Sequence, residues 1–201
     1  MKLIVMTNPS FFVEEDTIIT SLFDEGLECL HLYKPDSSPL LSERLLSLIP
    51  EEYYGRIIVH GHLYLKDEFA LGGIHLDDEK QLPPKGYKGK VGITCRNLDD
   101  LQRMKKKYSY VILQNVLNDA DTGEKSLYTP TQLAEAVHSR HIDRHVYAAG
   151  GINLSNIGTM KELGFGGVVI SSNLWNKFDI QNQKDFKNVI EYFRQLKKAV
   201  G

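Results

Sequence analysis

The chain alternates between short apolar, β-rich runs and helical patterns along almost its whole length. Several of the runs are continuously apolar, which is typical of strands buried on both faces of a parallel sheet. The runs are KLIVM (2–6), ECLHLY (28–33), RIIVH (56–60), GGIHL (72–76), KVGIT (90–94), YSYVIL (108–113), HVYAAG (145–150) and GGVVIS (166–171). Their alternation with helices predicts a parallel α/β fold.

Helical patterns separate most of these runs. They cover 14–25, 40–48, 97–104, a helix opened by the capping box Thr129-Pro130-Thr131-Gln132, 154–163, and a last helix from about Lys184. The connection 65–71 is short for a helix, and 79–88 is expected to be only a turn.

The fold class predicted from this order is α/β, a single (β/α)8 TIM barrel with seven or eight true strands. The length of 201 residues fits one domain over 1–201, because no linker or repeat divides the chain. A doubly wound open sheet is the competing interpretation.

Composition excludes several classes of partner. Hydrophobic residues make up 42% and charged residues 25%, and the formal net charge is -2. Without a basic arm or a long apolar stretch, neither nucleic acid nor a membrane is an expected partner. The apolar run at the start is too short for a signal peptide. Cys29 and Cys95 lie far apart in strand-like runs, so we expect a reduced, cytoplasmic protein. A homo-oligomer is left open, because the sequence does not determine the oligomeric state.

Histidines concentrate at the predicted strand ends, where the chemistry of a barrel is located. These are His31, His60, His62 and His75. On a strand, His60 and His62 would point to the same face, and such a pair can share a metal ion. The carboxylate that usually completes such a site is missing unless Asp77 supplies it. We therefore predict no metal, and leave open structural roles or proton transfer for these side chains.

The strongest local signal is a predicted phosphate site. Gly150 and Gly151 lack a Cβ, so their backbone N–H groups can approach a ligand, and Ile152 follows directly. Ser171 and Ser172 follow the eighth run. Loops after the seventh and eighth strands commonly bind phosphate in these barrels. A tight turn is the alternative explanation for the glycine pair.

The long polar segment 117–128 is interpreted as a solvated loop or a lid over the mouth of the barrel. Asp119 and Asp121 carry carboxylates of the kind that binds Mg²⁺. Cys95 is expected to be a buried apolar side chain rather than a reactive thiolate.

Taken together, the strand ends resemble the thiamine-phosphate synthase and TenI family over nearly the full length. The matching segments are HLYKP (31–35), IVHGH (58–62), GIHLDD (73–78), GITCR (92–96), QNVLNDADT (114–122), AGGI (149–152) and GGVVISS (166–172). The synthase joins a hydroxymethylpyrimidine diphosphate to a thiazole phosphate with Mg²⁺ and releases pyrophosphate. The resemblance implies that Gly150, Gly151, Ile152, Ser171 and Ser172 bind the phosphate of a thiazole-type ligand.

The half of the family pattern that binds diphosphate and Mg²⁺ is largely replaced. Tyr33 and Pro35 stand where the family has Arg and Lys, with Lys34 adjacent, and His60 and Gly61 stand for its Asn and metal-binding Asp.

Further replacements affect the same half. The second metal Asp aligns near Lys80, with Asp77 and Asp78 slightly early. Asp119, Asp121 and Thr122 replace its Thr, Thr and Lys, whereas Thr94 conservatively replaces a Ser.

Charge explains the expected consequence. One like-charge contact at about 4 Å costs roughly 4 kcal/mol at an effective dielectric near 20. Lys34 and Lys125 compensate only if their loops bring them inward. We therefore expect poor turnover of a diphosphate, and no cofactor unless the synthase reading holds, in which case Mg²⁺ is needed.

Glycine at the metal-Asp position is also the pattern of the TenI branch, a thiazole-phosphate aromatising isomerase. Its proton-transfer histidine aligns with Asn115. The function favoured from sequence is thus a TenI-like isomerase that binds a small phosphorylated thiazole-type ligand and uses His60, His62, His75 or His31. The alternatives are the synthase itself and a non-catalytic relative that binds a phosphate ligand.

Overall fold

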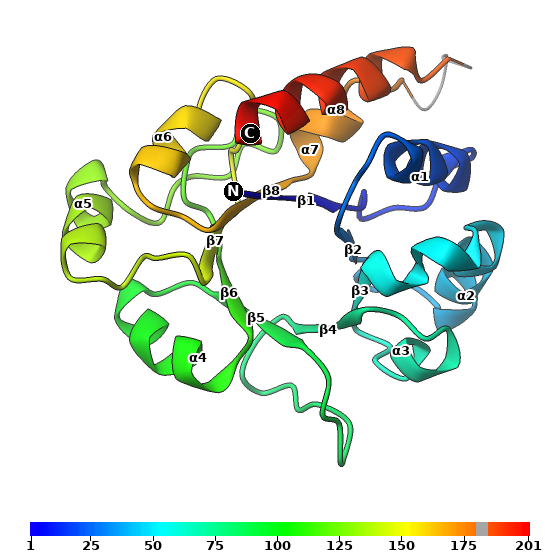
Figure 1. Cartoon of the computed structure of the whole chain (residues 1–201), viewed down its shortest axis with the longest axis horizontal. Helices are drawn as coiled ribbons and strands as arrows, with labels where there is room; N and C mark the ends of the chain where they lie inside the picture. The colour runs from blue at the N-terminus through cyan, green and yellow to red at the C-terminus, as the bar shows by residue number, and fades with distance from the viewer. Residues whose placement is uncertain (180–184) are drawn as a thin grey trace.

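The eight parallel strands close into a barrel in sequence order (Figure 1). The computed structural model describes residues 1–179 and 185–201. The strands are β1 (Lys2–Met6), β2 (Leu30–Leu32), β3 (Ile57–His60), β4 (Gly73–Leu76), β5 (Val91–Cys95), β6 (Tyr110–Leu113), β7 (Val146–Ala148) and β8 (Gly167–Ile170). Closure comes from parallel pairing of β8 with β1, for example Leu3 with Val168. The predicted (β/α)8 barrel is confirmed, and the open sheet is excluded.

Helices surround this barrel. They are α1 (Glu15–Asp24), α2 (Pro39–Leu48), α3 (Leu65–Glu68), α4 (Leu101–Lys107), α5 (Pro130–His138), α6 (Ile157–Glu162), α7 (Ser172–Trp175) and α8 (Lys187–Val200), with 3₁₀ turns η1 (Glu51–Arg56) and η2 (Leu98–Asp100). The predicted capping box at Thr129 is present, since its side chain accepts from the N–H of Gln132. The last helix was expected from about Lys184, which lies outside the described residues.

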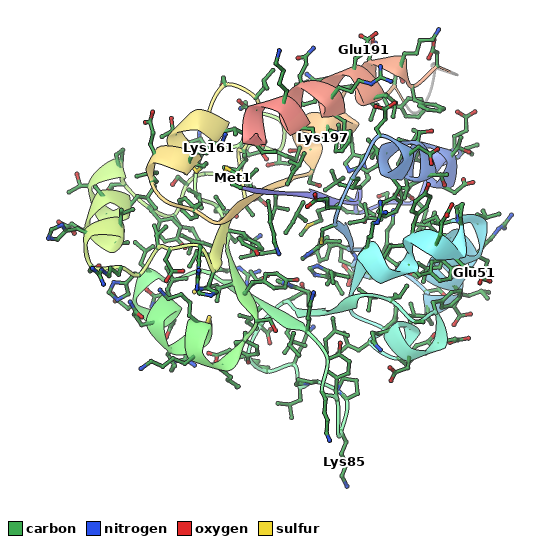
Figure 2. The ribbon with its side chains drawn as sticks, viewed as in Figure 1. Met1, Glu51, Lys85, Lys161, Glu191 and Lys197 are labelled. Carbon is green, nitrogen blue, oxygen red and sulfur yellow. The ribbon has the colours of Figure 1, made fainter. Side chains whose placement is uncertain are left out.

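The helices differ in length in ways that the sequence indicates. The short connection 65–71 holds only the single turn α3, and 77–90 contains no helix, as expected. Figure 2 shows Lys85 at the outer tip of this helix-free connection. The longest helix, α8, has 14 residues. In the described ranges, no helix combines the length and apolar character needed to cross a membrane.

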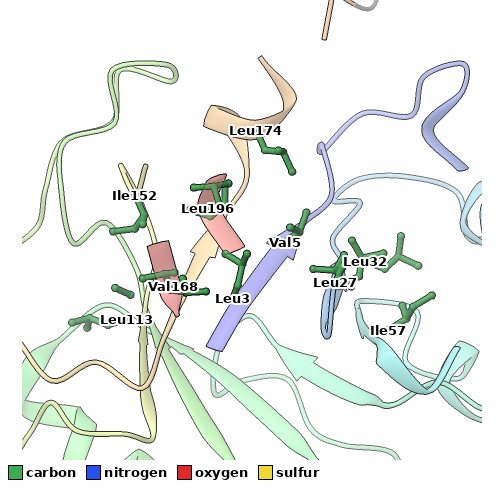
Figure 3. Packing of buried hydrophobic residues seen from close by; sticks show 14 of the residues in the cluster. Leu3, Val5, Leu27, Leu32, Ile57, Leu113, Ile152, Val168, Leu174 and Leu196 are labelled. Atoms are coloured by element: carbon green, nitrogen blue, oxygen red, sulfur yellow. The ribbon is translucent and has the colours of Figure 1, made fainter. Parts of the chain in front are cut away.

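Two apolar clusters pack on opposite sides of the sheet. The larger one fills the space between strands and helices, and α8 contributes Leu196 to the cluster that also contains Leu3 of β1 and Val168 of β8 (Figure 3). The smaller one lies inside the barrel and includes Ile4, Ile112, Tyr147, Ala149 and Val169. These inner residues come from β1, β6, β8 and the β7 end.

Inside the barrel, the side formed by β2, β3 and β4 is polar. His31 of β2, His60 of β3 and His75 of β4 are all buried. The register places His60 directly beside His75. A chain that places imidazoles inside a barrel must supply their hydrogen bonds from protein groups, because a buried polar atom without a partner is costly.

The expectation that His60 and His62 share one face is wrong. Strand β3 ends at His60, and Gly61 adopts a φ of 58°, in the left-handed region. The two-residue alternation of a strand therefore stops before His62. Nε2 of His62 instead lies 3.0 Å from the carbonyl oxygen of Ser37, outside the barrel interior.

Candidate functional site

A cavity of about 350 Å³ opens at the carboxyl ends of the strands. All five residues of the predicted phosphate site line it: Gly150, Gly151, Ile152, Ser171 and Ser172. The C-terminal face is where loops of a (β/α)8 barrel assemble a ligand site. The loops after β7 and β8, which carry these five residues, therefore lie on the wall of a single cavity.

Other predicted residues fall into two groups. Tyr33, His60, Thr94 and Asn115 also line the cavity. His31 and His75 are fully buried beneath it. In contrast, His62 and Lys34 do not contribute to the described cavity wall, and Lys125 is exposed.

The glycine pair has a packing role as well as any role in binding. Gly150 and Gly151 have φ values of 89° and 68°. A Cβ at Gly150 would lie 2.7 Å from Cα of Asn115, and one at Gly151 would collide with the carbonyl of Asn118. The glycines therefore let the β7 loop pack against the β6 loop. A substitution at Gly151 would disturb this packing and is a poor probe of ligand binding.

The segment 117–128 folds against the loop after β8. The Asp119 carboxylate accepts a hydrogen bond of 3.0 Å from the Ser172 hydroxyl. Asp121 accepts one of 3.0 Å from the side-chain amide of Asn173. Because Ser172 belongs to the predicted phosphate site, a carboxylate lies where an anionic ligand would have to bind.

Lys34 does not supply the missing positive charge. Its Nζ lies 2.6 Å and 2.7 Å from the two carboxylate oxygens of Glu15, and it donates to the carbonyls of Asn8 at 2.8 Å and Ser10 at 3.0 Å. Burial raises the pKa of Glu15 to about 7 and lowers the pKa of Lys34. The ammonium is fully committed to this buried cluster.

The charge on the described cavity wall is mainly negative. Arg96 is accompanied there by Asp77, Asp119, Asp121 and Glu124. The Arg96 guanidinium donates to the backbone carbonyl of Asp77 over 3.3 Å. A multiply charged anion would therefore meet more repulsion than attraction in this cavity.

His60 and Asp77 form the most defined acid–base pair on the wall. Nδ1 of His60 donates to Oδ1 of Asp77 over 2.7 Å. The His60 side chain is 2% exposed and the Asp77 side chain 32% exposed, so the carboxylate reaches the cavity while the imidazole is held behind it. Such an arrangement fixes the orientation of the imidazole ring.

The three buried histidines are joined into one network. Nε2 of His60 lies 2.9 Å from Nδ1 of His31. The Tyr110 hydroxyl lies 3.2 Å from Nε2 of His31 and 3.3 Å from Nδ1 of His75. Nε2 of His75 lies 2.9 Å from the Thr94 hydroxyl. All six imidazole nitrogens therefore have partners.

Burial keeps this network neutral. Desolvation, followed by the charge of His60, lowers the pKa of His31 and His75 well below the usual histidine value. Desolvation also raises the pKa of Tyr110 well above its usual value. The interior thus contains two neutral imidazoles and a protonated phenol.

A transition metal does not fit the cluster in this geometry. The three imidazoles offer nitrogens within 4.8 Å of one another. However, the His60 and His75 rings are stacked, with centroids 4.4 Å apart and planes 25° from parallel. A metal bonds close to the plane of an imidazole, and two rings stacked in this way do not bring both of their planes to one ion at bonding distance.

The Mg²⁺ that the synthase pattern implies also lacks a fitting set of ligands. His60 and Gly61 occupy positions where that pattern has Asn and Asp. Three of the four carboxylates on the wall already accept hydrogen bonds, Asp77 from His60, Asp119 from Ser172 and Asp121 from Asn173, which leaves Glu124 as the fourth. Hard oxygen ligands would have to be released before they could bind the ion.

The cysteines are not reactive thiolates. Burial raises the pKa of Cys29 to about 12 and also raises the pKa of Cys95. Cys95 donates to the carbonyl of Asn97 over 3.0 Å. This agrees with the expectation that Cys95 is a buried apolar side chain.

Two residues of the site escaped the sequence analysis. Tyr110 lies in the run 108–113, which was interpreted only as a strand. Trp175 lies after Ser172, the last site residue that the sequence predicted. The signal for Tyr110 was its spacing of two from Ile112, which points both side chains into the barrel. Trp175 lines the cavity and donates from its indole to the carbonyl of Met6 over 2.8 Å.

Comparisons with known proteins identify relatives that cover most of this chain. A crystal structure of thiamine phosphate pyrophosphorylase from Bacteroides thetaiotaomicron is 46% identical, covers 99% of this chain and 97% of its own, and has a TM-score of 0.89. The thiamine-phosphate synthase of Flavobacterium johnsoniae is 27% identical over 169 residues, 75% of this chain and 78% of its own. No family model matches the chain.

A more distant structure supports the fold alone. Thiamine phosphate pyrophosphorylase from Pyrococcus furiosus is 18% identical, covers 100% of this chain and 97% of its own, and has a TM-score of 0.71.

Fold and site together define a (β/α)8 barrel with its ligand cavity at the carboxyl ends of the strands. The 46% identity to the Bacteroides protein over nearly the full length identifies the family within this fold. The chain belongs to the thiamine-phosphate synthase/TenI family.

Proposed function

We propose that this barrel binds a thiazole-type phosphate monoester and isomerises it by proton transfer, as in the TenI branch. The observation that carries the proposal is the position of the His60–Asp77 pair. It lies on the wall of the same cavity that Gly150, Gly151 and Ser172 line. One cavity therefore offers a site for the phosphate and an acid–base pair for the ring.

The charge on the wall favours a monoester over a diphosphate. Arg96 shares the wall with four carboxylates, and the Lys34 ammonium is bound to Glu15. A diphosphate adds charge that neither residue can neutralise, and one like-charge contact at about 4 Å costs roughly 4 kcal/mol at an effective dielectric near 20. A single phosphate can be held by backbone N–H groups and hydroxyls at the β7 and β8 loops.

Proton transfer can use the residues that are present. Asn115 stands where the TenI branch has its histidine, and an amide cannot take up a proton near neutral pH. Asp77 is exposed enough to meet a ligand and is paired with His60. We assign the acid–base role to this pair, with Thr94 and Tyr33 beside the ring of the ligand. This chemistry requires no metal.

The test is direct conversion of the thiazole phosphate tautomer, followed by proton NMR. Conversion by the wild type and its loss in His60→Gln, with binding retained, would support the proposal. The dephosphorylated ligand should bind at least about tenfold more weakly, because it leaves the phosphate site empty. Binding without any conversion would instead indicate a non-catalytic ligand-binding relative.

The second candidate is thiamine-phosphate synthase. It is favoured by the 46% identity to a protein named thiamine phosphate pyrophosphorylase. It predicts Mg²⁺-dependent release of pyrophosphate when both synthase substrates are supplied. Isomerisation and pyrophosphate release involve different bonds, so the two assays separate the candidates.

A further inference from the structure

The buried histidines connect two separate points of the cavity wall. Thr94 and Asp77 both line the cavity. An unbroken series of hydrogen bonds runs between them through the barrel interior. In order, its members are Thr94, His75, Tyr110, His31, His60 and Asp77.

We propose that these six residues form a proton relay that takes up a proton at Thr94 and makes one available at Asp77. The proposal rests on the proposed isomerase function, because an aromatising isomerisation removes a proton at one position of the ligand and returns one at another. It extends that function by assigning roles to His31, His75 and Tyr110, none of which lines the cavity.

The Asp77 carboxylate sets the direction of every hydrogen bond in the resting relay. A carboxylate only accepts, so Nδ1 of His60 must carry hydrogen and its Nε2 must accept. His31 then donates from Nδ1 to His60 and accepts at Nε2 from the Tyr110 hydroxyl. All of these bonds point toward Asp77.

The same logic fixes the other half. The Tyr110 oxygen, having donated its hydrogen to His31, accepts from Nδ1 of His75. Nε2 of His75 accepts from the Thr94 hydroxyl over 2.9 Å. Each neutral histidine therefore carries its hydrogen on Nδ1, and the Thr94 oxygen retains lone pairs for a proton donor in the cavity.

One added proton reverses the direction of the hydrogen bonds that join the first five members, from Thr94 to His60. The ligand gives a proton to the Thr94 oxygen as Thr94 gives its own to Nε2 of His75. Nδ1 of His75 passes its proton to Tyr110, and Tyr110 passes its own to Nε2 of His31. Nδ1 of His31 then protonates Nε2 of His60. His31 and His75 end neutral, and the positive charge lies on His60, beside the Asp77 carboxylate.

The second transfer completes the isomerisation. The His60 imidazolium gives its Nδ1 proton to Asp77, and Asp77 protonates the ligand at its second position. The number of protons on protein plus ligand is unchanged, and no oxidant or reductant is needed. The relay then returns to its resting direction by reorientation of the hydroxyls and exchange of the imidazole protons.

The fold provides space for the central link of the relay, the contact between His75 and the Tyr110 hydroxyl. A Cβ at Gly92 would lie 2.5 Å from Nδ1 of His75 and 2.5 Å from the Tyr110 hydroxyl oxygen. The absence of a side chain at Gly92 therefore permits the approach of these two groups. The ring of Tyr110 is also held by stacking on Tyr147, with centroids 5.3 Å apart.

The first experiment measures tautomers and does not depend on activity. In ¹⁵N-histidine NMR at about pH 8, above the usual histidine pKa, His31, His60 and His75 should all carry hydrogen on Nδ1. In any state in which His60 carries hydrogen on both nitrogens, His31 and His75 should be in the Nε2 tautomer while both stay neutral. The titratable groups that face His60 are Asp77, Tyr33, His31 and His75. An Nε2 tautomer at His31 or His75 while His60 is neutral would overturn the relay.

The second experiment uses a matched pair of tyrosine variants in the tautomer conversion assay. Tyr110→Phe should lower kcat at least about tenfold with KM within about threefold, since it removes the central link but no ligand contact. Tyr147→Phe keeps the stacked ring and removes a hydroxyl outside the relay, so its kcat should equal that of the wild type. Thr94→Val should also lower kcat, because it removes the hydroxyl that joins the relay to the cavity.

The outcomes separate the relay from the proposed function. Conversion by the wild type with an unchanged kcat in Tyr110→Phe would refute the relay and leave the isomerase standing. No conversion by the wild type would refute the isomerase, and the tautomer measurement would then decide the relay alone.

Discussion

The Nδ1 atom of His60 lies 2.7 Å from Oδ1 of Asp77, at the boundary between the buried histidines and the open cavity. This contact joins a side chain that is almost fully buried to one that reaches the ligand space. It combines an orientation fixed by the fold with access for a substrate, which is what a general acid–base pair requires.

Removing the Asp77 carboxylate should therefore impair chemistry more than binding. We expect Asp77→Asn to lower kcat for tautomer conversion by about 100-fold while KM changes less than about threefold. Asp78→Asn is the matched control, because Asp78 is adjacent and caps the turn at Lys80 instead of contacting His60. Equal losses in the two variants would show that the Asp77–His60 contact has no special role.

Stability should depend on pH through His31 and His75. Their folded-state pKa values are lowered by burial, so the unfolded chain binds more protons below its histidine pKa. The contribution of these two histidines to the free energy of unfolding is thus fully present above about pH 6.5 and falls below it, by about 1.4 kcal/mol per histidine per pH unit. Glu15, whose pKa burial raises to about 7, acts in the opposite direction over part of the same range. Urea unfolding between about pH 8 and pH 5.5 measures this.

Two variants test the assignment of that pH dependence. His75→Gln should reduce the rise of the free energy of unfolding with pH below about pH 6.5 by about 1.4 kcal/mol per pH unit, because one of the two buried imidazoles is gone. His138→Gln, on the exposed end of α5, should keep the wild-type slope. A His138→Gln variant with the larger change would contradict the burial argument.

The barrel itself was predictable from the sequence, and the reason is physical. Buried parallel strands are recognised by apolar runs such as 56–60 and 166–171, and the capping box at Thr129 marks a helix start by its hydrogen bonds. Strand ends were therefore located well enough to bring Gly150, Ser171 and Thr94 to one cavity.

What the sequence left undetermined depends on single residues. Whether His62 joins His60 depended on where β3 stops, and Gly61 stops it. The direction of Lys34 depended on a partner 19 residues away, Glu15. Tyr110 was hidden in an apolar run, because an inward-facing tyrosine and a strand-forming tyrosine have the same local pattern.

The Lys34–Glu15 pair should be required for stability. We expect Lys34→Met to lower the free energy of unfolding by about 3 kcal/mol near pH 8, because it leaves the Glu15 carboxylate buried without its partner. Since burial raises the pKa of Glu15 to about 7, stability contributed by this group falls as pH rises from about 4.5 through 7. The loss in Lys34→Met should accordingly be smaller near pH 5.

An exposed pair serves as the comparison for that prediction. Lys187 pairs with Asp185 on the surface, so Lys187→Met should change the free energy of unfolding by less than about 0.5 kcal/mol. Replacing both Lys34 and Glu15, as Lys34→Met with Glu15→Gln, should restore part of the loss. A double variant less stable than Lys34→Met alone would contradict the account of an unpaired carboxylate.

Phosphate binding should be limited by Asp119. Its carboxylate accepts from Ser172 and would repel an incoming phosphate, so Asp119→Asn should lower the Kd for a thiazole phosphate about three- to tenfold. Calorimetric titration measures the change. Glu162→Gln removes one negative charge on the exposed surface of α6 and should leave Kd unchanged. Weaker binding in Asp119→Asn would mean that Asp119 helps to order the site for phosphate.

We expect the cavity to support proton transfer on a phosphate monoester and not condensation with a diphosphate. The most direct measurement is pyrophosphate release from hydroxymethylpyrimidine diphosphate and thiazole phosphate with Mg²⁺, run beside the Flavobacterium johnsoniae synthase. We predict release at least about 100-fold slower than by that enzyme, together with conversion of the thiazole phosphate tautomer. Release at a comparable rate would contradict the account and identify the chain as a working synthase.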